Sequence, residues 1–291
     1  MFKKCTLLFS AILLTSSINA QINILNAKEV DEIGQIGNDQ MAKNIDVPIP
    51  YGYIDDRDVL WSKVVWEFID LNQKINLPYY FPTDTTSVSS DRRSLWHTLY
   101  NAVKQGEIGA YDSDLFITTV TEADIEKKLF NTRGTGKFND EGEEYMDPFA
   151  IELDEITGLM IKGIWYFDKR QGELKYRLLG IAPMGADVLT QGKKNINDEG
   201  FVKEFFWVFY PAAREILHEA KVFNPKNSMQ PISFDHLLNA RRFSSVIVKE
   251  ENIYNNRKIE DYVRGNSLFQ LLEADRIKES IRNREMDMWS Y

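Results

Sequence analysis

Two apolar segments joined by a short polar stretch constrain the fold of this chain more than any other feature. Residues 159–167 and 174–181 are rich in branched and aromatic side chains, and residues 168–173 between them are mostly polar or charged. Two strand-like runs that flank such a stretch predict an antiparallel β-hairpin with a loop of more than two residues. Because side chains alternate between the two faces of a strand, Trp165 and Phe167 are expected on the same face.

A helix is predicted upstream of the hairpin, over residues 59–74. Apolar side chains recur every three or four positions from Leu60 to Leu71, which is the spacing of an amphipathic helix. Asp58 can cap the first turn, and Pro78 lies just beyond the predicted end.

Helices and strands follow one another irregularly along the rest of the chain. A second helix is predicted between Ser94 and Gly106, and Thr121 with Asp124 has the spacing of a capping box before a third. The other predicted elements are a strand with both faces covered at 205–210, a helix from Pro211, a short helix at 234–242, a strand at 243–249 and a helical tail at 258–289. This order predicts an α+β fold: N-terminal helices, a central antiparallel β-hairpin and strands with intervening helices, and a C-terminal helical segment.

Residues 1–20 have the pattern of a secretory signal peptide. Two lysines precede an apolar stretch at residues 5–14 that is too short to span a membrane, and Ala20 is a suitable cleavage residue. A buried N-terminal helix is the alternative interpretation. Cleavage would remove the only cysteine, so the exported chain would depend on core packing and not on disulfides, which fits a bacterial periplasm.

The composition permits a sizeable core and argues against some classes of partner. Hydrophobic residues make up 43% of the chain, and its formal net charge is −9. Proteins that coat nucleic acid or bind anionic lipid need clustered lysine and arginine, so we expect no nucleic-acid partner. After the signal peptide, the sequence offers no apolar run long enough for a membrane span.

After the signal peptide, we expect a flexible N-terminal arm at residues 21–50 and a single α+β domain at residues 51–291. The charged, glycine-rich sequence at 131–147 predicts a solvated loop, and a sub-boundary of the domain could fall there.

The end of the predicted arm has a distinct chemistry. Pro48 and Pro50 favour an extended backbone, because a residue before proline is pushed out of the helical region. Tyr51 and Tyr53 follow at once. This segment is interpreted either as an ordinary linker or as a strap that docks on a partner at a small entropic cost.

The sequence predicts no catalytic, cofactor-binding or metal-binding residue. His218 and Glu219 begin like the helix motif of zinc proteases, but residue 222 is Val222, so the second histidine ligand is missing. Glu215 and His218 have the spacing of a di-iron helix, but no second pair of this kind accompanies them. We therefore expect no cofactor and no metal.

Short strings spread in order over residues 45–291 resemble one protein family. The strings lie at residues 66–71, 76–82, 93–95, 106–111, 165–168, 179–183, 206–211, 242–250, 253–254, 259–262 and 288–291. Together they are similar to the GldN/PorN family, the soluble periplasmic ring component of the type IX secretion and gliding motility machinery.

The resemblance implies a non-enzymatic assembly protein of the periplasm. Members of this family are exported without a lipid anchor and associate with an outer-membrane lipoprotein of the GldK/PorK type, with which they form a large ring. They also connect toward the periplasmic part of the GldM/PorM-type motor protein. For this chain, the resemblance implies copies of itself as neighbours and membrane contact only through the lipoprotein, at the outer membrane.

An exported, aromatic-rich chain leaves a second interpretation open, namely a periplasmic enzyme or carbohydrate-binding module that acts on the cell envelope. If the chain is an assembly subunit, the docking strap is one interface candidate, and the aromatic residues that end the charged C-terminal helix are another, because little chain remains to cover them and interface cores favour such side chains. The candidates are Pro48, Pro50, Tyr51, Tyr53, Trp289 and Tyr291.

Overall fold

The structure is a computed structural model. It describes residues 47–83, 92–138, 144–151, 155–186, 202–224 and 232–289, with the backbone alone for 131–138, 144–149 and 289. The predicted signal peptide, most of the predicted arm and Tyr291 lie outside the described residues. Residues Pro48–Tyr291 group into one compact unit.

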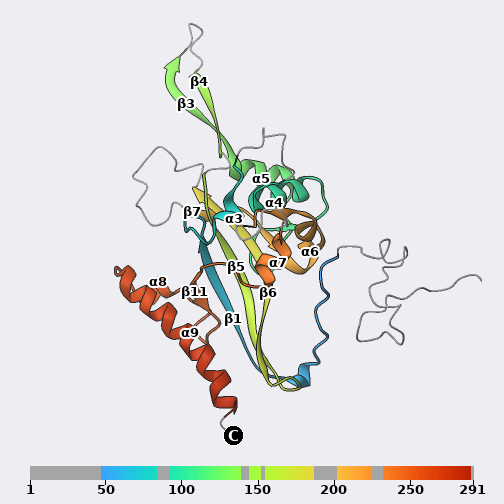
Figure 1. The fold of residues 1–291 in the computed structure, drawn as a ribbon. Helices are drawn as coiled ribbons and strands as arrows, with labels where there is room; N and C mark the ends of the chain where they lie inside the picture. The colour runs from blue at the N-terminus through green and yellow to red at the C-terminus, as the bar shows by residue number, and fades with distance from the viewer. Residues whose placement is uncertain are drawn as a thin grey trace, which may run out of the picture. The chain divides into compact units, whose positions relative to one another are not determined.

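An antiparallel sheet forms the centre of this unit (Figure 1). In the described residues, it has seven strands in the order β11-β1-β5-β6-β8-β2, and β7 pairs with β6 beside this path. The strands are β1 (Val59–Asp70), β2 (Ala110–Tyr111), β5 (Ile156–Asp168), β6 (Glu173–Ala186), β7 (Val202–Glu204), β8 (Trp207–Phe209) and β11 (Val246–Glu250).

The predicted hairpin is confirmed as β5 and β6. Their pairing ends at Asp168↔Glu173, and Gly172 occupies the left-handed region at φ 65° in the turn between them. Further along β5, Gly163 is needed for a different reason. A Cβ atom at Gly163 would meet the Tyr176 hydroxyl at 2.1 Å, so only glycine lets that ring lie across the strand.

The helix predicted over residues 59–74 is wrong, because this segment forms β1. The strand pairs with β5 from Val59↔Asp168 to Asp70↔Gly158 and with β11 along part of its length. Its neighbouring residues Val65 and Trp66 are both buried, on opposite faces. A central strand with both faces covered has apolar side chains at consecutive positions, and such a run can also match the spacing of a helix.

The loop predicted at residues 131–147 is also wrong. Strands β3 (Phe130–Phe138) and β4 (Glu144–Ala150) pair with each other over much of this region, and Figure 1 shows them as a two-stranded ribbon that projects from the body. Backbone hydrogen bonds between strands require no apolar side chains, so the charged, glycine-rich sequence gave no signal of this pairing.

The helices agree more closely with the sequence. Ser94 caps α4 by accepting a hydrogen bond from the His97 N–H at 3.2 Å, and Pro211 lies in the first turn of α6. Thr121 is the N-cap residue of α5, but the predicted capping box does not form, because the Thr121 hydroxyl donates to the Asp124 carboxylate at 2.7 Å and its side chain accepts no backbone N–H. The helices are α3 (Leu77–Tyr80), α4 (Leu95–Lys104), α5 (Glu122–Leu129), α6 (Tyr210–Glu219), α7 (Phe234–Asn239), α8 (Ile259–Tyr262) and α9 (Ser267–Trp289), with a 3-10 turn η2 (Asp56–Asp58). Two short strands, β9 (Lys221–Val222) and β10 (Ile232–Ser233), pair beside α6 and α7.

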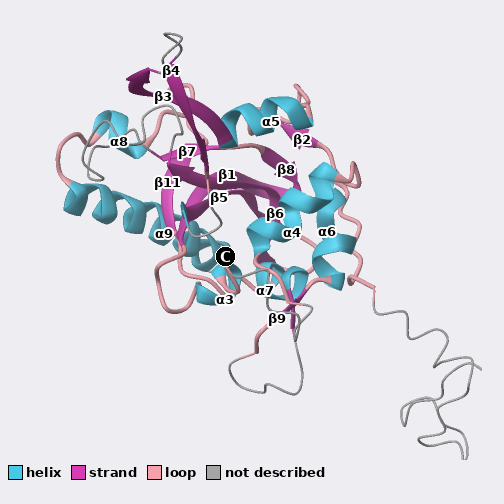
Figure 2. Cartoon of the chain, turned by 90° about the horizontal axis from the view of Figure 1, so that it is seen from above, coloured by secondary structure: helices cyan, strands magenta, loops and turns pink. Residues whose placement is uncertain are grey.

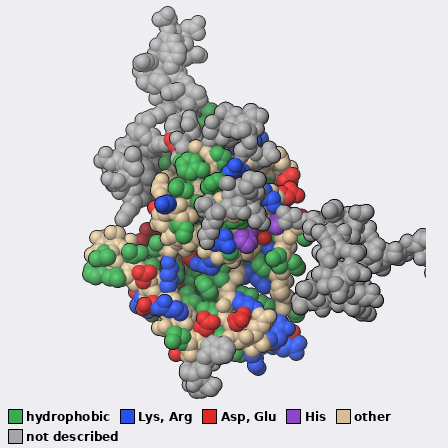
Figure 3. All heavy atoms as spheres, viewed as in Figure 1, with side chains coloured by type: hydrophobic (Ala, Val, Ile, Leu, Met, Phe, Trp, Pro, Cys, Tyr) green, Lys and Arg blue, Asp and Glu red, His purple; other side chains and the backbone are tan. Residues whose placement is uncertain are grey.

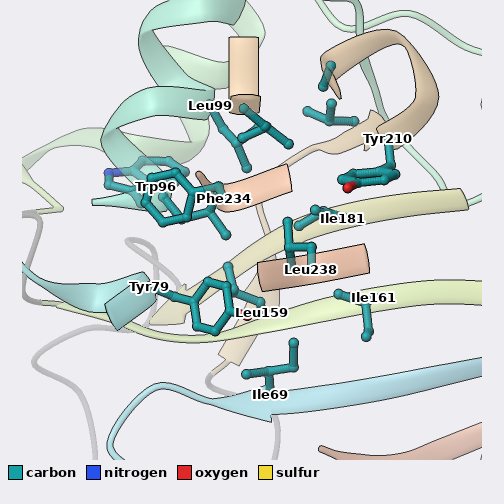
Figure 4. Close-up of a cluster of buried hydrophobic side chains, with 14 of the residues drawn as sticks. Ile69, Tyr79, Trp96, Leu99, Leu159, Ile161, Ile181, Tyr210, Phe234 and Leu238 are labelled. Carbon is teal, nitrogen blue, oxygen red and sulfur yellow. The ribbon is translucent and has the colours of Figure 1, made fainter. Parts of the chain in front are cut away.

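The largest hydrophobic cluster lies between the sheet and helices α3, α4, α6 and α7. Figure 4 shows Trp96 and Leu99 from α4, Phe234 and Leu238 from α7, and Ile181 of β6 in this cluster. These side chains are fully or almost fully buried, and their removal from water is the main favourable contribution to folding.

A second cluster fixes α9 on the sheet, and Figure 2 shows this helix apart from α4, α6 and α7. Ala274, Ile277 and Ile281 of α9 pack on Val65 of β1 and Ile247 of β11. The long C-terminal helix is therefore part of the packed body, as the helical tail in the sequence predicted. In the described part of the chain, none of the helices has the length and apolar character that a membrane span requires.

Candidate interaction site

The segment that enters β1 is fixed to the body through Tyr51. We call residues 48–53 the strap. Two guanidinium groups contact the Tyr51 ring, with Arg214 of α6 at 4.2 Å and Arg177 of β6 at 4.6 Å from the ring centre. Its hydroxyl donates a hydrogen bond to Asn239 Oδ1 at 2.9 Å. Both distances are within the range at which a cation is attracted to an aromatic ring, so these contacts help to hold Tyr51 in place.

Three arginines also hold the backbone of the strap. Arg214 Nη2 donates to the Ile49 carbonyl at 2.7 Å, Arg177 Nη2 to the Gly52 carbonyl at 3.2 Å, and Arg170 Nη2 to the Tyr53 carbonyl at 2.9 Å. An extended segment has no helical partner for its carbonyls, so these charge-assisted bonds satisfy groups that would otherwise need water.

A buried carboxylate supports the arginine at the centre of this arrangement. Asp235 of α7 accepts from Arg214 Nε at 2.9 Å and from Arg214 Nη2 at 3.1 Å, which is a bidentate pair. It also accepts from the Tyr210 hydroxyl at 2.6 Å and from Asn239 Nδ2 at 2.9 Å. A buried charge is tolerated where its lone pairs are filled in this way.

The electrostatics keep this network in one charge state. Burial raises the pKa of Tyr51, and Asp235 raises it further, although Arg214 opposes the change. Burial and then the hydrogen bond to Asp235 raise the pKa of Tyr210. Burial alone would lower the pKa of Arg214, but Asp235 raises it overall. Both phenols therefore stay neutral, and Arg214 stays charged, around neutral pH.

The strap presents other side chains to solvent. Ile49 and Tyr53 are each 81% exposed, whereas Tyr51 is partly buried. Pro48 is half-buried, and Pro50 is exposed. The strap therefore has a backbone held in place by hydrogen bonds, one anchored side chain, Tyr51, and two largely exposed side chains, Ile49 and Tyr53.

A comparison with protein families identifies the chain. The family model described as "Gliding motility associated protein GldN" matches residues 54–290. The chain belongs to the GldN family. Membership makes it a component of the gliding motility and type IX secretion machinery. A search of curated proteins found no match.

The GldN match includes the residues that hold the strap but not the strap itself. Arg170, Arg177, Arg214 and Asp235 lie within residues 54–290, which run from the approach to β1 to the end of α9. The sequence indicated the strap from its prolines and tyrosines, but it gave no sign that these four residues would hold it. They come from the β5–β6 turn, β6, α6 and α7, and only the fold brings them together.

The histidines of this GldN-family chain do not form one cluster. His218 and His236 line a cavity of about 460 Å³ beside the strap, whereas His97 lines a different one of about 720 Å³. Figure 3 shows histidine and basic side chains together on the face beside the strap. Asp235, which also lines the first cavity, forms an ion pair with Arg214 at 2.9 Å. Among the described residues, no group of three or more His, Cys, Asp or Glu could hold a metal ion.

The two C-terminal interface candidates are placed only in part. Trp289 ends α9, and the structure describes its backbone but not its side chain. Tyr291 lies outside the described residues. The structure therefore does not test either residue as an interface candidate.

Proposed function

We propose that this GldN-family chain is a non-enzymatic assembly subunit of the gliding motility and type IX secretion machinery, and that it works in the periplasm after removal of residues 1–20. It binds an outer-membrane lipoprotein of the GldK/PorK type and the periplasmic part of a GldM/PorM-type motor, and it joins copies of itself in a ring. The lipoprotein holds it at the outer membrane. Family membership supports the proposal.

The anchored strap is the observation that carries the proposal. Its backbone is fixed by three arginines while Ile49 and Tyr53 remain 81% exposed. A segment that is already ordered loses little further entropy when a partner binds, and tyrosine is enriched at the centre of protein interfaces. Pro48, Pro50 and Tyr51 thus position the strap, and Ile49 and Tyr53 contact the partner.

Other parts of the chain have supporting roles in this proposal. Residues 51–291 act as the single assembly domain, and residues 21–50 contribute an arm whose first part orders on a partner. Trp289 and Tyr291, at the end of a highly charged helix, form a second contact.

Extraction of native envelopes with mild detergent tests the proposal. The lipoprotein that co-purifies with the wild-type chain is identified by mass spectrometry and quantified. Changing both exposed strap residues, Ile49→Ala with Tyr53→Ala, is expected to lower its recovery about tenfold, because hot-spot side chains each contribute over 1 kcal/mol. The matched control changes two exposed apolar residues elsewhere, Ile75→Ala with Tyr254→Ala, and should retain it.

Two results would contradict this function. One is recovery of the wild-type chain as a lone subunit, without any lipoprotein. The other is turnover of a cell-envelope substrate by the isolated subunit that is lost on changing His218→Ala while the melting temperature is unchanged. The second result would favour the enzyme interpretation.

A further inference from the structure

Part of β6 has a strand neighbour on one side only, and this part lies beside the strap (Figure 1). Residues 173–178 pair with β5, whereas β8 and β7 pair with the other side of β6 only from Gly180 onward. We call residues 173–178 the free edge of β6. Within the described residues, no strand and no backbone hydrogen bond covers its outer side. Such an edge presents unpaired backbone N–H and C=O groups, to which an extended segment can add.

The cavity of about 460 Å³ beside the strap is formed in part by this free edge. Residues 175–177 of β6 line it together with residues 49–54. The volume lies within the range of ligand sites in proteins, roughly 300–1,000 Å³. A segment bound in this cavity would therefore contact both the strap and the edge of the sheet.

The charges that line the cavity are unequal in number. Among the described residues, four lysine or arginine side chains line it, but only two aspartates do. Three of the four cations form ion pairs with carboxylates: Arg214 with Asp235 at 2.9 Å, Lys175 with Asp168 at 3.5 Å, and Arg170 with Asp58 at 2.9 Å. Arg177 is the fourth, and the structure gives it no carboxylate partner in the part of the chain that it describes. The net charge of the chain is −9, so a general excess of basic residues does not explain this unpaired cation.

The Arg177 guanidinium keeps donors for a further acceptor. Of its five N–H groups, the described residues engage only one at Nη2, which donates to the Gly52 carbonyl at 3.2 Å. The rings of Tyr51 and Tyr166 lie 4.6 Å and 5.7 Å from the guanidinium carbon, and they attract the cation without neutralising it. A guanidinium with unused N–H groups binds a carboxylate or a phosphate through two parallel hydrogen bonds.

We infer that this cavity binds an extended, acidic segment of a partner protein, which adds as a strand to the free edge of β6 and places a carboxylate on Arg177. The guanidinium alone would suit a phosphate equally well. The strand edge beside it selects a polypeptide, because only a backbone with N–H and C=O groups can continue the ladder of the sheet. This inference rests on the proposed function, in which the strap contacts a partner, and it assigns the chemistry of the segment that the partner supplies.

Selection from a library of random peptides tests the chemistry of this site. Peptides of about seven residues, close to the length of a typical strand, are displayed and selected on the full chain without its predicted signal peptide. The wild type should enrich Asp or Glu at one position. The best selected peptide should bind about tenfold more tightly than its counterpart with an amide in place of that carboxylate, because hydrogen bonds to charged groups are the stronger ones.

Two arginine variants separate the charge of the site from the attachment of the strap. Arg177→Gln should abolish the enrichment of acidic peptides. The matched control is Arg170→Gln, because Arg170 also lines the cavity and holds the strap at the Tyr53 carbonyl, but its charge is already paired with Asp58. This control should still select acidic peptides. The comparison of the carboxylate and amide peptides on the wild type needs no variant, so it stays decisive if a substitution disturbs the strap.

Methylation of single backbone nitrogens in the selected peptide tests the strand addition. An N-methyl group removes one N–H donor, and only every second residue of an added strand points its N–H toward β6. Methylation should lower the affinity about fivefold at those positions and have little effect at the positions between them. The affinities are measured by fluorescence anisotropy with a labelled peptide.

The inference is overturned if no acidic residue is enriched, if Arg177→Gln selects the same peptides as the wild type, or if methylation acts equally at every position. Peptide binding that appears only after deletion of residues 21–44 would assign the cavity to the chain's own arm. Arg177-dependent binding to vesicles of anionic phospholipid, without peptide binding, would assign it to a phosphate. Both results would also overturn the inference.

Failure of this inference and failure of the proposed function are distinguishable. Recovery of the lipoprotein from native envelopes is measured separately, with variants of Ile49 and Tyr53, so an absence of acidic-peptide binding leaves that result unchanged. Conversely, recovery of a lone subunit from envelopes would contradict the proposed function even if the isolated chain selected acidic peptides as expected.

Discussion

At the scale of single residues, the buried pair of Arg214 and Asp235 is the part of the strap site with the largest energetic consequence. Both side chains are almost completely buried, and Asp235 accepts hydrogen bonds from three different residues. Removing one partner of such a pair leaves an uncompensated charge, which costs more than the pair itself contributes. The strap is therefore attached to a buried ion pair, and loss of either partner is expected to destabilise this region strongly.

We expect Asp235→Ala to lower the free energy of unfolding by about 3–5 kcal/mol, because Arg214 would remain buried without its counter-charge. Urea denaturation followed by circular dichroism measures the change. The control is Asp112→Ala, which removes the exposed ion pair with Lys128 and should cost less than about 1 kcal/mol. Equal losses in the two variants would contradict the structural account.

Glu204 gives a pH-dependent prediction. Burial raises its pKa, although the hydrogen bond from Trp207 Nε1 at 2.6 Å opposes the change. The folded state thus holds the Glu204 proton more tightly than the unfolded state does. The contribution of the protonated Glu204 to the free energy of unfolding is therefore lost as the pH rises from the unfolded pKa, about 4.5, through the raised folded pKa. Glu204→Gln keeps a hydrogen-bond acceptor and removes this loss.

Unfolding free energies of the wild type and Glu204→Gln, measured in urea at several pH values, check this point. The stability of the variant relative to the wild type should increase as the pH rises above about 4.5, and should then level off. A constant difference between the two proteins across that range would show that Glu204 has an ordinary pKa.

At the scale of elements, the sequence predicted the helix α9 correctly and the strand β1 incorrectly. The way in which each element is buried explains the difference. The spacing of β1 resembled that of a helix because Val65 and Trp66 are buried on opposite faces. In contrast, α9 buries one narrow row, Ala274, Ile277 and Ile281, which keeps the helical period. Lys278 Nζ also donates to the Ser245 carbonyl at 2.6 Å, next to this row.

Ile277→Ala should therefore release α9 before the rest of the molecule unfolds. Large-to-small changes at buried isoleucine cost about 2–5 kcal/mol, and Ile277 is the middle residue of the buried row that packs α9 on the sheet. Hydrogen exchange followed by mass spectrometry should show faster exchange in residues 267–289 with little change in β5 and β6. The control Ser280→Ala, at an exposed position of the same helix, should leave exchange there unchanged.

At the scale of the whole molecule, the contacts group residues from Pro48 onward into one compact unit. Its sheet carries a projecting ribbon, β3 and β4, and separate hydrophobic clusters, which include one under α9 and one under α4, α6 and α7. Exposed apolar side chains remain on the strap, on the loop after β2 at Leu115 and Ile117, and at the start of α9.

Deleting residues 21–44 should leave the melting temperature of this unit unchanged, because the strap that enters β1 begins after them. The same deletion should weaken assembly, since an arm that orders on its partner contributes only in the complex. Differential scanning calorimetry and co-purification from native envelopes measure the two effects. A large loss of thermal stability would instead show that the arm is part of the folded unit.

The sequence by itself determined the elements whose signals are local. The β5–β6 hairpin, the Ser94 cap, the start of α6 at Pro211 and the helical tail follow from short-range spacing and turn chemistry. The strings along the chain also led to the correct family, because they retain their order over most of its length.

Only the tertiary structure decided the features that depend on distant partners. Pairing with β5 and β11 made residues 59–70 a strand, and the approach of Arg177 and Arg214 turned Tyr51 into an anchor. The fold likewise decided that α9 packs on Val65, on one side of β1, and that the loop with Asp114 contacts Trp66, on the other. Side-chain periodicity records how a segment is buried but not which distant segment buries it, and that missing information is what the fold supplies.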